Sequence, residues 1–208
     1  MNRAKARFFD GQVEAPWAAA PYGPDEQPKI RRLLAEAKLP RGARVLEPGC
    51  GTGRLTAILA DAVGPTGRVV ALDISPGMVQ ACRARVAGRE WVQVLEAAVE
   101  EVAIPPETFD AVVCHQVLPH VDDQAQALAR LGRGLTPHGR LLVVHFISAA
   151  RVNAVHAGAA GPIQGDRLPP RRAMRRLCRE AGLTVRVLVD DALGYLLCAT
   201  RLSVGSRR

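Results

Sequence analysis

Short apolar runs alternate with amphipathic stretches along most of the chain. The runs are shorter than core helices usually are, so they predict strands. They cover residues 43–47, 67–73, 91–95, 109–115 and 139–146. Apolar side chains recur at helical spacing before the first run and in the two gaps that follow it. This spacing predicts helices over residues 26–37, 54–63 and 75–86. This alternation is typical of a doubly wound α/β fold, in which helices cover both faces of a mostly parallel sheet.

One more helix is expected between the last two of these strands. Asp122 and Asp123 offer caps for its amino terminus. Leu128, Leu131 and Leu135 then recur at helical spacing and are expected on its buried face.

The end of the chain departs from the alternating pattern. Residues 147–168 are glycine-rich and polar and predict a long loop at the carboxyl end of a strand, where ligand lids are often found. A helix is expected over residues 169–179. Apolar runs at 184–191 and 193–201 are too close together for a crossover helix, so they predict an antiparallel hairpin at the sheet edge.

Composition fits a single α/β domain without targeting segments. The chain has 208 residues, of which 48% are hydrophobic, and contains no apolar stretch long enough to span a membrane. Its start, MNRAKARFFD, lacks the apolar core of a secretory signal, so a cytoplasmic protein is expected. The five cysteines are far apart and form no CxxC pair, which predicts reduced thiols and no metal site.

The basic charge raises the question of nucleic acid as a partner. The formal net charge is +8, but most cations are arginines scattered among alanine, glycine and proline. Two denser groups occur, in residues 169–179 and in the final SRR. On a helix, the arginines of 169–179 would form a solvated face opposite Met174 and Cys178, so the pattern disfavours nucleic acid as a substrate.

Three glycines follow the first predicted strand in the sequence EPGCGTG. Gly49, Gly51 and Gly53 let the chain turn sharply and let a ligand approach the backbone. The spacing is GxGxG, whereas the dinucleotide fingerprint is GxGxxG, which argues against a pyrophosphate ligand. Asp73 ends the second strand about 20 residues further on, where a carboxylate can bind both ribose hydroxyls. Together these features predict a site for a nucleoside without a diphosphate.

Four segments, in order, resemble the motifs of class I S-adenosylmethionine-dependent methyltransferases. They are VLEPGCGTGRLT, VVALDISPGMV, FDAVVCHQVLPHV and LTPHGRLLVVHF. Within that family they look most similar to small-molecule enzymes such as the ubiquinone and menaquinone C-methyltransferases. The resemblance implies a Rossmann-like, seven-stranded sheet with the antiparallel C-terminal strand inserted at one edge. It also implies S-adenosyl-L-methionine as cofactor and S-adenosyl-L-homocysteine as product.

The same resemblance implies a set of cofactor-binding residues at the ends of the strands. These are Glu47, Gly49, Cys50, Gly51, Gly53, Asp73, Ile74, Met78, Ala98, Val99, His115, Gln116 and Val117. Asp73 would hold the ribose. Many relatives have an aspartate where this chain has Ala98, so a bond to the adenine amine is missing; Glu100 or a backbone group could replace it, or cofactor affinity could be modest.

Methyl transfer from a sulfonium demands little chemistry of the protein. It is an in-line displacement from a reactive donor, so alignment and exclusion of water can carry much of the catalysis. A general base is needed only if the acceptor must lose a proton. His120, His145 and His115 are the candidates, with His156 in addition, because imidazole can accept a proton near neutral pH. The alternative is that each imidazole only hydrogen-bonds a loop; His138, on the opposite edge, is expected to be exposed and inert.

Two further features bear on the site. Phe8, Phe9, Trp17 and Tyr22 gather near the amino terminus of a chain with few aromatics, which predicts a lid over the site or a plug against the core. Cys50 is common in this loop among relatives, so the resemblance argues against a catalytic thiol there. Cys114 is expected to end an adjacent strand near the cofactor, and a catalytic thiol is the disfavoured interpretation there too.

The sequence thus predicts one methyltransferase domain over residues 1–208. Its parts would be a lid segment (1–24), a cofactor-binding core (25–146), a lid or loop insertion (147–168) and a C-terminal helix and hairpin (169–208). The expected activity is transfer of a methyl group by in-line displacement to a small, aromatic or apolar metabolite. An RNA methyltransferase and a non-catalytic S-adenosylmethionine-binding protein are the alternatives. The acceptor atom and the oligomeric state are left open.

Overall fold

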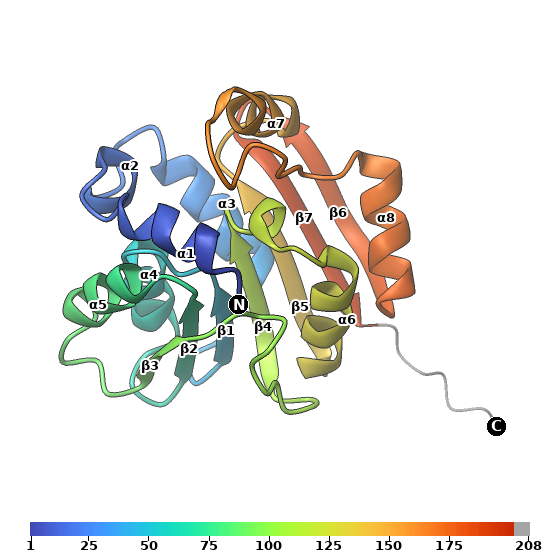
Figure 1. The fold of residues 1–208 in the computed structure, drawn as a ribbon. Helices are drawn as coiled ribbons and strands as arrows, with labels where there is room; N and C mark the ends of the chain where they lie inside the picture. The colour runs from blue at the N-terminus through green and yellow to red at the C-terminus, as the bar shows by residue number, and fades with distance from the viewer. Residues whose placement is uncertain (202–208) are drawn as a thin grey trace.

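The computed structural model describes residues 1–201 and contains one seven-stranded sheet (Figure 1). The strands are β1 (Arg44–Pro48), β2 (Arg68–Asp73), β3 (Val92–Glu96), β4 (Phe109–His115), β5 (Leu135–His145), β6 (Leu183–Asp191) and β7 (Gly194–Arg201). Their order across the sheet is β3-β2-β1-β4-β5-β7-β6. Strands β1 to β5 pair in parallel, whereas β7 is antiparallel to both β5 and β6. The predicted fold class, with the antiparallel strand inserted at the edge, is therefore confirmed.

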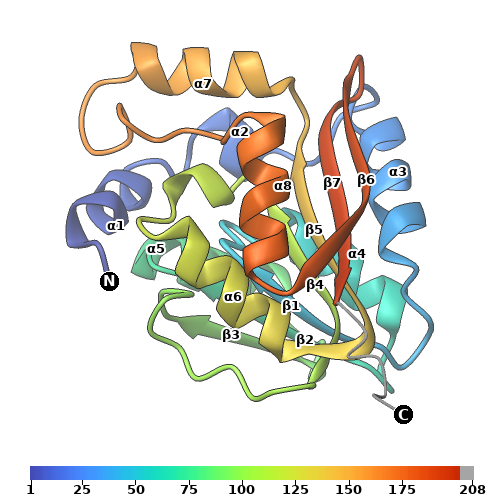
Figure 2. The ribbon, with the colours of Figure 1, turned by 90° about the vertical axis from the view of Figure 1, so that its right-hand side faces the viewer.

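Helices cover both faces of the sheet. The helices are α1 (Arg3–Asp10), α2 (Pro16–Ala19), α3 (Gln27–Ala37), α4 (Arg54–Val63), α5 (Pro76–Arg85), α6 (Gln124–Gly134), α7 (Ala149–Gly158) and α8 (Arg171–Glu180), with a short 3-10 turn at Leu118–His120. Helices α3 and α4 lie on one face and α6 and α8 on the other (Figure 2). Helix α5 packs beside α4 against β2 and β3. The strands are therefore buried on both sides, as their apolar sequences predict.

Local sequence signals account for several of these boundaries. The Ser75 hydroxyl caps α5 by accepting a hydrogen bond from the Met78 backbone N–H at 3.1 Å. Pro76 occupies the first turn, where a missing N–H does no harm. The arginines of α8 are exposed while Met174 and Cys178 are fully buried, which confirms the predicted amphipathic orientation.

Leu135 was predicted on the buried face of α6, and this is wrong. The helix ends at Gly134, and Leu135 begins β5, where it pairs with Phe109. Glycine is a poor helix former, and Gly134 follows Gly132 by two positions while Pro137 lies just beyond, so the helix stops before Leu135. Leu135 is still buried, but as a strand residue, and β5 is four residues longer at its start than the predicted 139–146.

Two segments predicted without helices contain them. Within 147–168, α7 begins after Ser148, whose hydroxyl accepts from the Arg151 backbone N–H at 3.3 Å. The glycines that indicated a loop all lie at or beyond the end of this helix. The amino-terminal segment contains α1, capped by the side chain of Asn2, and the single turn α2. Its small and aromatic residues gave no clear helical period.

The elements outside the sheet gather at one end of it. In Figure 1, α1, α2 and α7 lie beyond the carboxyl ends of the parallel strands. Ligands of open α/β sheets bind at this end, where the strand order reverses between β1 and β4. Among residues 1–201, no helix is long and apolar enough to cross a membrane. Residues 202–208, which include the final SRR, lie outside the described residues.

Candidate active site

A cavity of about 540 Å³ lies at the carboxyl ends of β1, β2 and β4. Its volume is in the range of roughly 300–1,000 Å³ that is usual for small-molecule sites. Of the residues predicted to bind the cofactor, these line it: Gly49, Cys50, Gly51, Asp73, Ile74, Met78, Ala98, Val99, His115, Gln116 and Val117. Glu47 and Gly53 do not. The fold therefore gathers most of a sequence-predicted set into one hollow.

The glycine loop forms the floor of the cavity between β1 and α4. Gly49, Gly51 and Gly53 all have positive φ angles, of 68°, 53° and 82°. A Cβ on Gly49 would lie 2.3 Å from a methyl carbon of Val117, and one on Gly53 would lie 2.8 Å from the Cys82 sulfur. A Cβ on Gly51 would meet no protein atom within 4 Å, although Gly51 lines the cavity. Gly51 thus leaves its backbone open to a ligand. At Gly49 and Gly53 the absence of a side chain instead makes room for Val117 and Cys82.

Asp73 ends β2 and is 9% exposed. Its two carboxylate oxygens accept backbone N–H bonds from Gly51 at 2.8 Å and from Ser75 at 3.0 Å. Burial raises the pKa of Asp73, and these backbone bonds oppose the rise. An ionised carboxylate has about four acceptor positions, so acceptor capacity remains for a hydroxyl of a bound ligand. This arrangement fits the ribose of a nucleoside.

Next to Asp73 the wall is apolar. Ile74, Met78, Ala98 and Val99 line it, and the last three are almost fully buried. Such an apolar wall suits the flat face of a purine. Glu100 also lines the cavity, but one of its carboxylate oxygens accepts from the Asp122 backbone N–H at 3.2 Å.

Glu47 lies behind the glycine loop at 1% exposure. Burial raises its pKa well above the usual value, against the opposing effect of a hydrogen bond with Thr56. Its second carboxylate oxygen has no hydrogen-bond partner within residues 1–201. The five cysteines are all free and buried, and burial raises the pKa of Cys114 to about 12. Cys114 is therefore a poor nucleophile and does not line the cavity.

The end of β4 places His115, Gln116 and Val117 under the cavity. Gln116 has a positive φ of 56°, which turns the chain sharply after the strand. The His115 ring packs against Phe146, with centroids 4.5 Å apart, and against Tyr22 at 6.2 Å. Burial, and then the positive charge of Arg54, lower the pKa of His115 to about 3. His115 is therefore neutral at physiological pH and a weak base.

His145 ends β5 but does not line the cavity. It is 3% exposed, packs beside Tyr195 on the paired strand, and leaves its Nε2 without a partner within the described chain. Burial lowers its pKa to about 3. Exposed His138 lies in β5 at the opposite end of the sheet, as expected.

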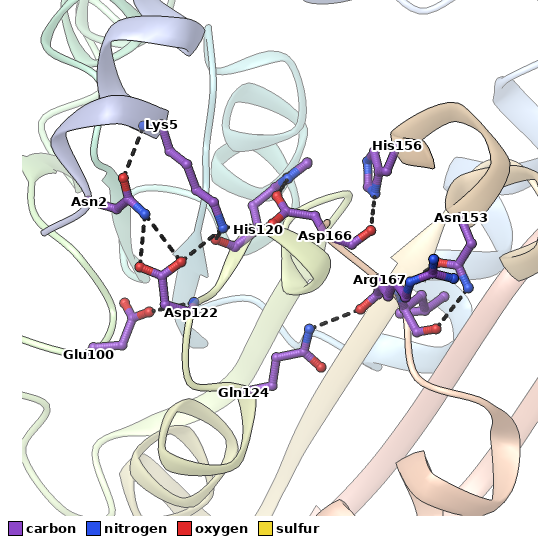
Figure 3. A network of polar contacts seen from close by, with 11 residues as sticks. Asn2, Lys5, Glu100, His120, Asp122, Gln124, Asn153, His156, Asp166 and Arg167 are labelled. Carbon is purple, nitrogen blue, oxygen red and sulfur yellow. Dashed lines mark hydrogen bonds and ion pairs between the residues drawn. The ribbon is translucent and has the colours of Figure 1, made fainter. Parts of the chain in front are cut away.

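His120 lies in the turn after β4, lines the cavity and belongs to a polar cluster (Figure 3). Its Nδ1 lies 2.6 Å from a carboxylate oxygen of Asp166. The other oxygen of Asp166 lies 2.8 Å from the Lys5 ammonium, which also pairs with Asp122 at 2.9 Å. Lys5 in addition donates to the His120 backbone carbonyl at 2.8 Å. The cluster thus joins α1, the turn after β4 and the segment after α7.

The amino-terminal segment forms one wall of the cavity. Phe9, Trp17 and Tyr22 line it, whereas Phe8 packs edge-on against Phe9. Arg54, at the start of α4, donates to the Trp17 carbonyl at 2.6 Å and stacks 3.8 Å over the Tyr22 ring. Tyr22 also packs against the hydrophobic core on the α3 and α4 side of the sheet.

The Asp10 carboxylate attaches the end of α1 to α5. It accepts from the Ser75 hydroxyl at 2.6 Å and from the Gly77 backbone N–H at 2.8 Å. The amino-terminal segment is therefore fixed to α5 as well as to α4 and to the turn after β4.

Sequence reasoning missed Lys5, Asp166 and Arg54. Lys5 and Asp166 are separated by most of the chain, and each looks like an ordinary surface residue in its own segment. Their one distinctive signal is that lysines are rare here, with only three in the chain. Arg54 follows Gly53 directly, and nothing in its own segment indicates a contact with the amino-terminal residues.

Comparison with known proteins agrees with this geometry. A family model described as a methyltransferase domain matches residues 46–143. The ubiquinone/menaquinone biosynthesis C-methyltransferase of Hahella chejuensis is 34% identical over 133 residues, which cover 60% of this chain and 53% of that protein. The match thus spans about half the length of that relative. An uncharacterized methyltransferase of Mycobacterium tuberculosis is 36% identical over 187 residues, 83% of this chain and 88% of that one.

A solved structure shares the fold over nearly the whole chain. The geranyl diphosphate C-methyltransferase of Streptomyces coelicolor A3(2) superposes with a TM-score of 0.75 at 14% identity, covering 94% of this chain and 96% of that one. At this identity the likeness concerns the fold alone. The mycobacterial relative, by contrast, is matched over most of its length, and the glycine loop, Asp73 and the strand order occur together here. The chain belongs to the class I methyltransferases, enzymes that use S-adenosyl-L-methionine as methyl donor.

Proposed function

We propose that the protein methylates a small, apolar or aromatic metabolite. The observation that carries this proposal is the lining of the cavity beyond the glycine loop. There, on the β4 side, the walls are Phe9, Trp17, Tyr22, His115 and His120. Aromatic rings of this kind suit a flat or apolar acceptor. The quinone-methylating relative is consistent with such an acceptor.

The charges around the cavity argue against RNA as the acceptor. Glu100, Glu101, Asp122 and Asp123 lie along its lining. Arg54 is the only arginine or lysine lining it within residues 1–201, and it is paired with Glu26 at 3.2 Å. Nucleic-acid sites are lined by unpaired cations, and no unpaired arginine or lysine of residues 1–201 lines this cavity. The excess positive charge of the chain lies elsewhere, for example on the exposed face of α8.

The donor's chemistry is a methyl group on a sulfonium, ready for in-line displacement. In the proposed assignment, Asp73 binds the ribose hydroxyls, and Ile74, Met78, Ala98 and Val99 enclose the adenine. Gly49, Cys50 and Gly51 surround the methionine part, with Glu47 and Gly53 behind them, and His115, Gln116 and Val117 lie below the sulfur. Residues 1–24 act as a lid that excludes water, a role for which their contacts with α4 and α5 are suited.

Calorimetric titration with S-adenosylmethionine and with S-adenosylhomocysteine tests the cofactor site. Binding of both in the micromolar range is expected. Radiolabelled methyl transfer is then measured with a set of quinols and phenols and, separately, with total RNA. Label in the small molecules and none in RNA supports the proposal. Label in RNA alone would overturn it.

A further inference from the structure

His120 and Asp166 form an acid–imidazole pair at the wall of the cavity. The Asp166 side chain is 9% exposed and the His120 side chain 14% exposed, with 2.6 Å between carboxylate oxygen and Nδ1. Their positions, in the turn after β4 and in the segment between α7 and α8, are far apart in the sequence. Phe9 lies edge-on to the imidazole at 5.0 Å, and His156 lies 4.8 Å away. The ring is thus held by packing as well as by the hydrogen bond (Figure 3).

Lys5 keeps the carboxylate charged. Burial alone would raise the pKa of Asp166, but the hydrogen bonds from His120 and Lys5 outweigh it and lower the pKa. An ionised carboxylate can only accept hydrogen bonds, so the imidazole must donate through Nδ1–H. In the neutral ring the lone pair is then on Nε2.

Nε2 of His120 is the free side of this ring. Within residues 1–201 it makes no hydrogen bond, and it is not among the buried atoms left without a partner. Since His120 lines the cavity, Nε2 is available to a molecule bound there. The other three candidate bases are less suitable: burial lowers the pKa of His115 and makes it a weak base, and neither His145 nor His156 lines the cavity.

We propose that His120 is the general base of the reaction, that Asp166 and Lys5 are positioning residues, and that the acceptor reacts through a hydroxyl group. This inference rests on the function proposed above and narrows its substrate class to phenols, quinols or enols. The acceptor O–H bond breaks and its proton moves to Nε2. The oxygen uses the electron pair to bond the methyl carbon, and the sulfur keeps the electrons of the bond that breaks. The proton later leaves the imidazolium for water.

The tautomer of His120 can be measured without any acceptor. Nitrogen-15 spectra of the histidine rings are recorded for the protein saturated with S-adenosylhomocysteine at pH 8, and the His120 signals are assigned by their loss in His120→Gln. The Nδ1–H tautomer is expected in the parent protein. In Asp166→Asn the amide can donate to Nδ1, so the Nε2–H form should replace it. An Nε2–H ring in the parent protein would overturn the proposal even if the variant did not fold.

Methyl transfer to matched acceptors tests the role of the base. Catechol and 2-naphthol require removal of a proton, whereas thiophenol ionises readily by itself. We expect His120→Gln to lower kcat for the phenols by about 10²- to 10⁴-fold, with little change for thiophenol, and Asp166→Asn to lower kcat by at least about 10-fold at constant KM. His138→Gln, which removes an exposed imidazole, is the control. An equal loss of kcat for the phenols and for thiophenol in His120→Gln would contradict the proposal. If none of these acceptors reacts, the tautomer of His120 measured by nitrogen-15 spectra tests the proposal by itself.

Failure of the broader function gives a different result. A protein that does not bind S-adenosylhomocysteine refutes the function proposed above. A protein that binds it with parental affinity in His120→Gln, yet methylates phenols at the parental rate in that variant, refutes only the role of His120.

Discussion

Val117, in the turn after β4, fills the space beside Gly49 in the loop after β1. A Cβ at position 49 would lie 2.3 Å from the Val117 Cγ2 atom and 2.6 Å from its Cβ. The two segments meet where the strand order reverses, between β1 and β4. The contact therefore fixes the spacing of the two loops that form the cavity floor.

Gly49→Ala is expected to destabilise the fold by about 2–5 kcal/mol. A left-handed conformation costs a residue with a side chain about 1–2 kcal/mol, and overpacking adds about 1–3 kcal/mol. Gly51→Ala meets no protein atom within 4 Å, so only the conformational cost of about 1–2 kcal/mol applies to it. Urea unfolding measures both effects. Equal stability of the two variants would contradict the packing described here.

The variants Gly49→Ala and Gly51→Ala also distinguish an effect on stability from an effect on cofactor binding. Gly51 lines the cavity, so an added methyl group would occupy ligand space rather than protein space. At temperatures where Gly51→Ala is fully folded, we expect it to bind S-adenosylhomocysteine at least about 10-fold more weakly than the parent does, the effect of 1.4 kcal/mol of lost contact. Calorimetry supplies the comparison. Parental affinity would place the cofactor elsewhere.

Asp73→Asn is expected to weaken binding of S-adenosylhomocysteine by about 10- to 150-fold. This range corresponds to the roughly 1.5–3 kcal/mol contributed by hydrogen bonds to a charged group. Asp110→Asn is a suitable control, because the Asp110 carboxylate also accepts a backbone N–H, from Arg44 at 2.8 Å, but does not line the cavity. If both substitutions weaken binding equally, the effect of Asp73 is structural, and the ribose assignment is wrong.

The sheet could be predicted because its signals are local. Apolar runs, the Ser75 cap and the hairpin spacing each depend on a few neighbouring residues, and the predicted strands were confirmed within a few residues. The errors occurred where glycines can either end a helix or belong to a loop. Gly132 and Gly134 end α6 early, so that Leu135 starts β5, while the glycines after α7 obscured the helix before them.

The residues of the cavity could be predicted only in part, because only some of them lie in local sequence motifs. Asp73, Gly49 and Gly51 belong to short motifs at strand ends, and all three line the cavity. Lys5 and Asp166 meet only because α1 and the segment after α7 both fold over the strand ends. That contact depends on tertiary packing. The residues around Lys5 and around Asp166 show no local pattern that indicates it.

Glu47 should make stability fall as pH rises. Its pKa in the folded protein is raised by burial, so the folded state holds its proton more tightly than the unfolded state does. The resulting stabilisation is fully present below the usual glutamate pKa and is lost as pH rises through the folded value. Glu47→Gln removes the charge at similar size. We expect it to be more stable than the parent by about 1–3 kcal/mol at pH 8 and nearly equal at pH 4.

Unfolding curves at both pH values test this expectation, with Glu180→Gln as an exposed control. The prediction fails if Glu47→Gln is the less stable protein at pH 8, because that result would mean that the carboxylate is favourably paired in the folded state.

Arg54→Lys is expected to loosen the amino-terminal segment without unfolding the sheet. The guanidinium donates to the Trp17 carbonyl, stacks on Tyr22 and pairs with Glu26. A lysine ammonium lacks the planar fork that makes these contacts together. Loss of one charged hydrogen bond, worth about 1.5–3 kcal/mol, should speed hydrogen exchange of α2 by at least about 10-fold while β4 is unchanged. In Arg89→Lys, which alters an exposed pair with Asp61 on α4, exchange of α2 should match the parent. Unchanged exchange of α2 in Arg54→Lys would show that the segment is held by its apolar contacts and by Asp10 instead.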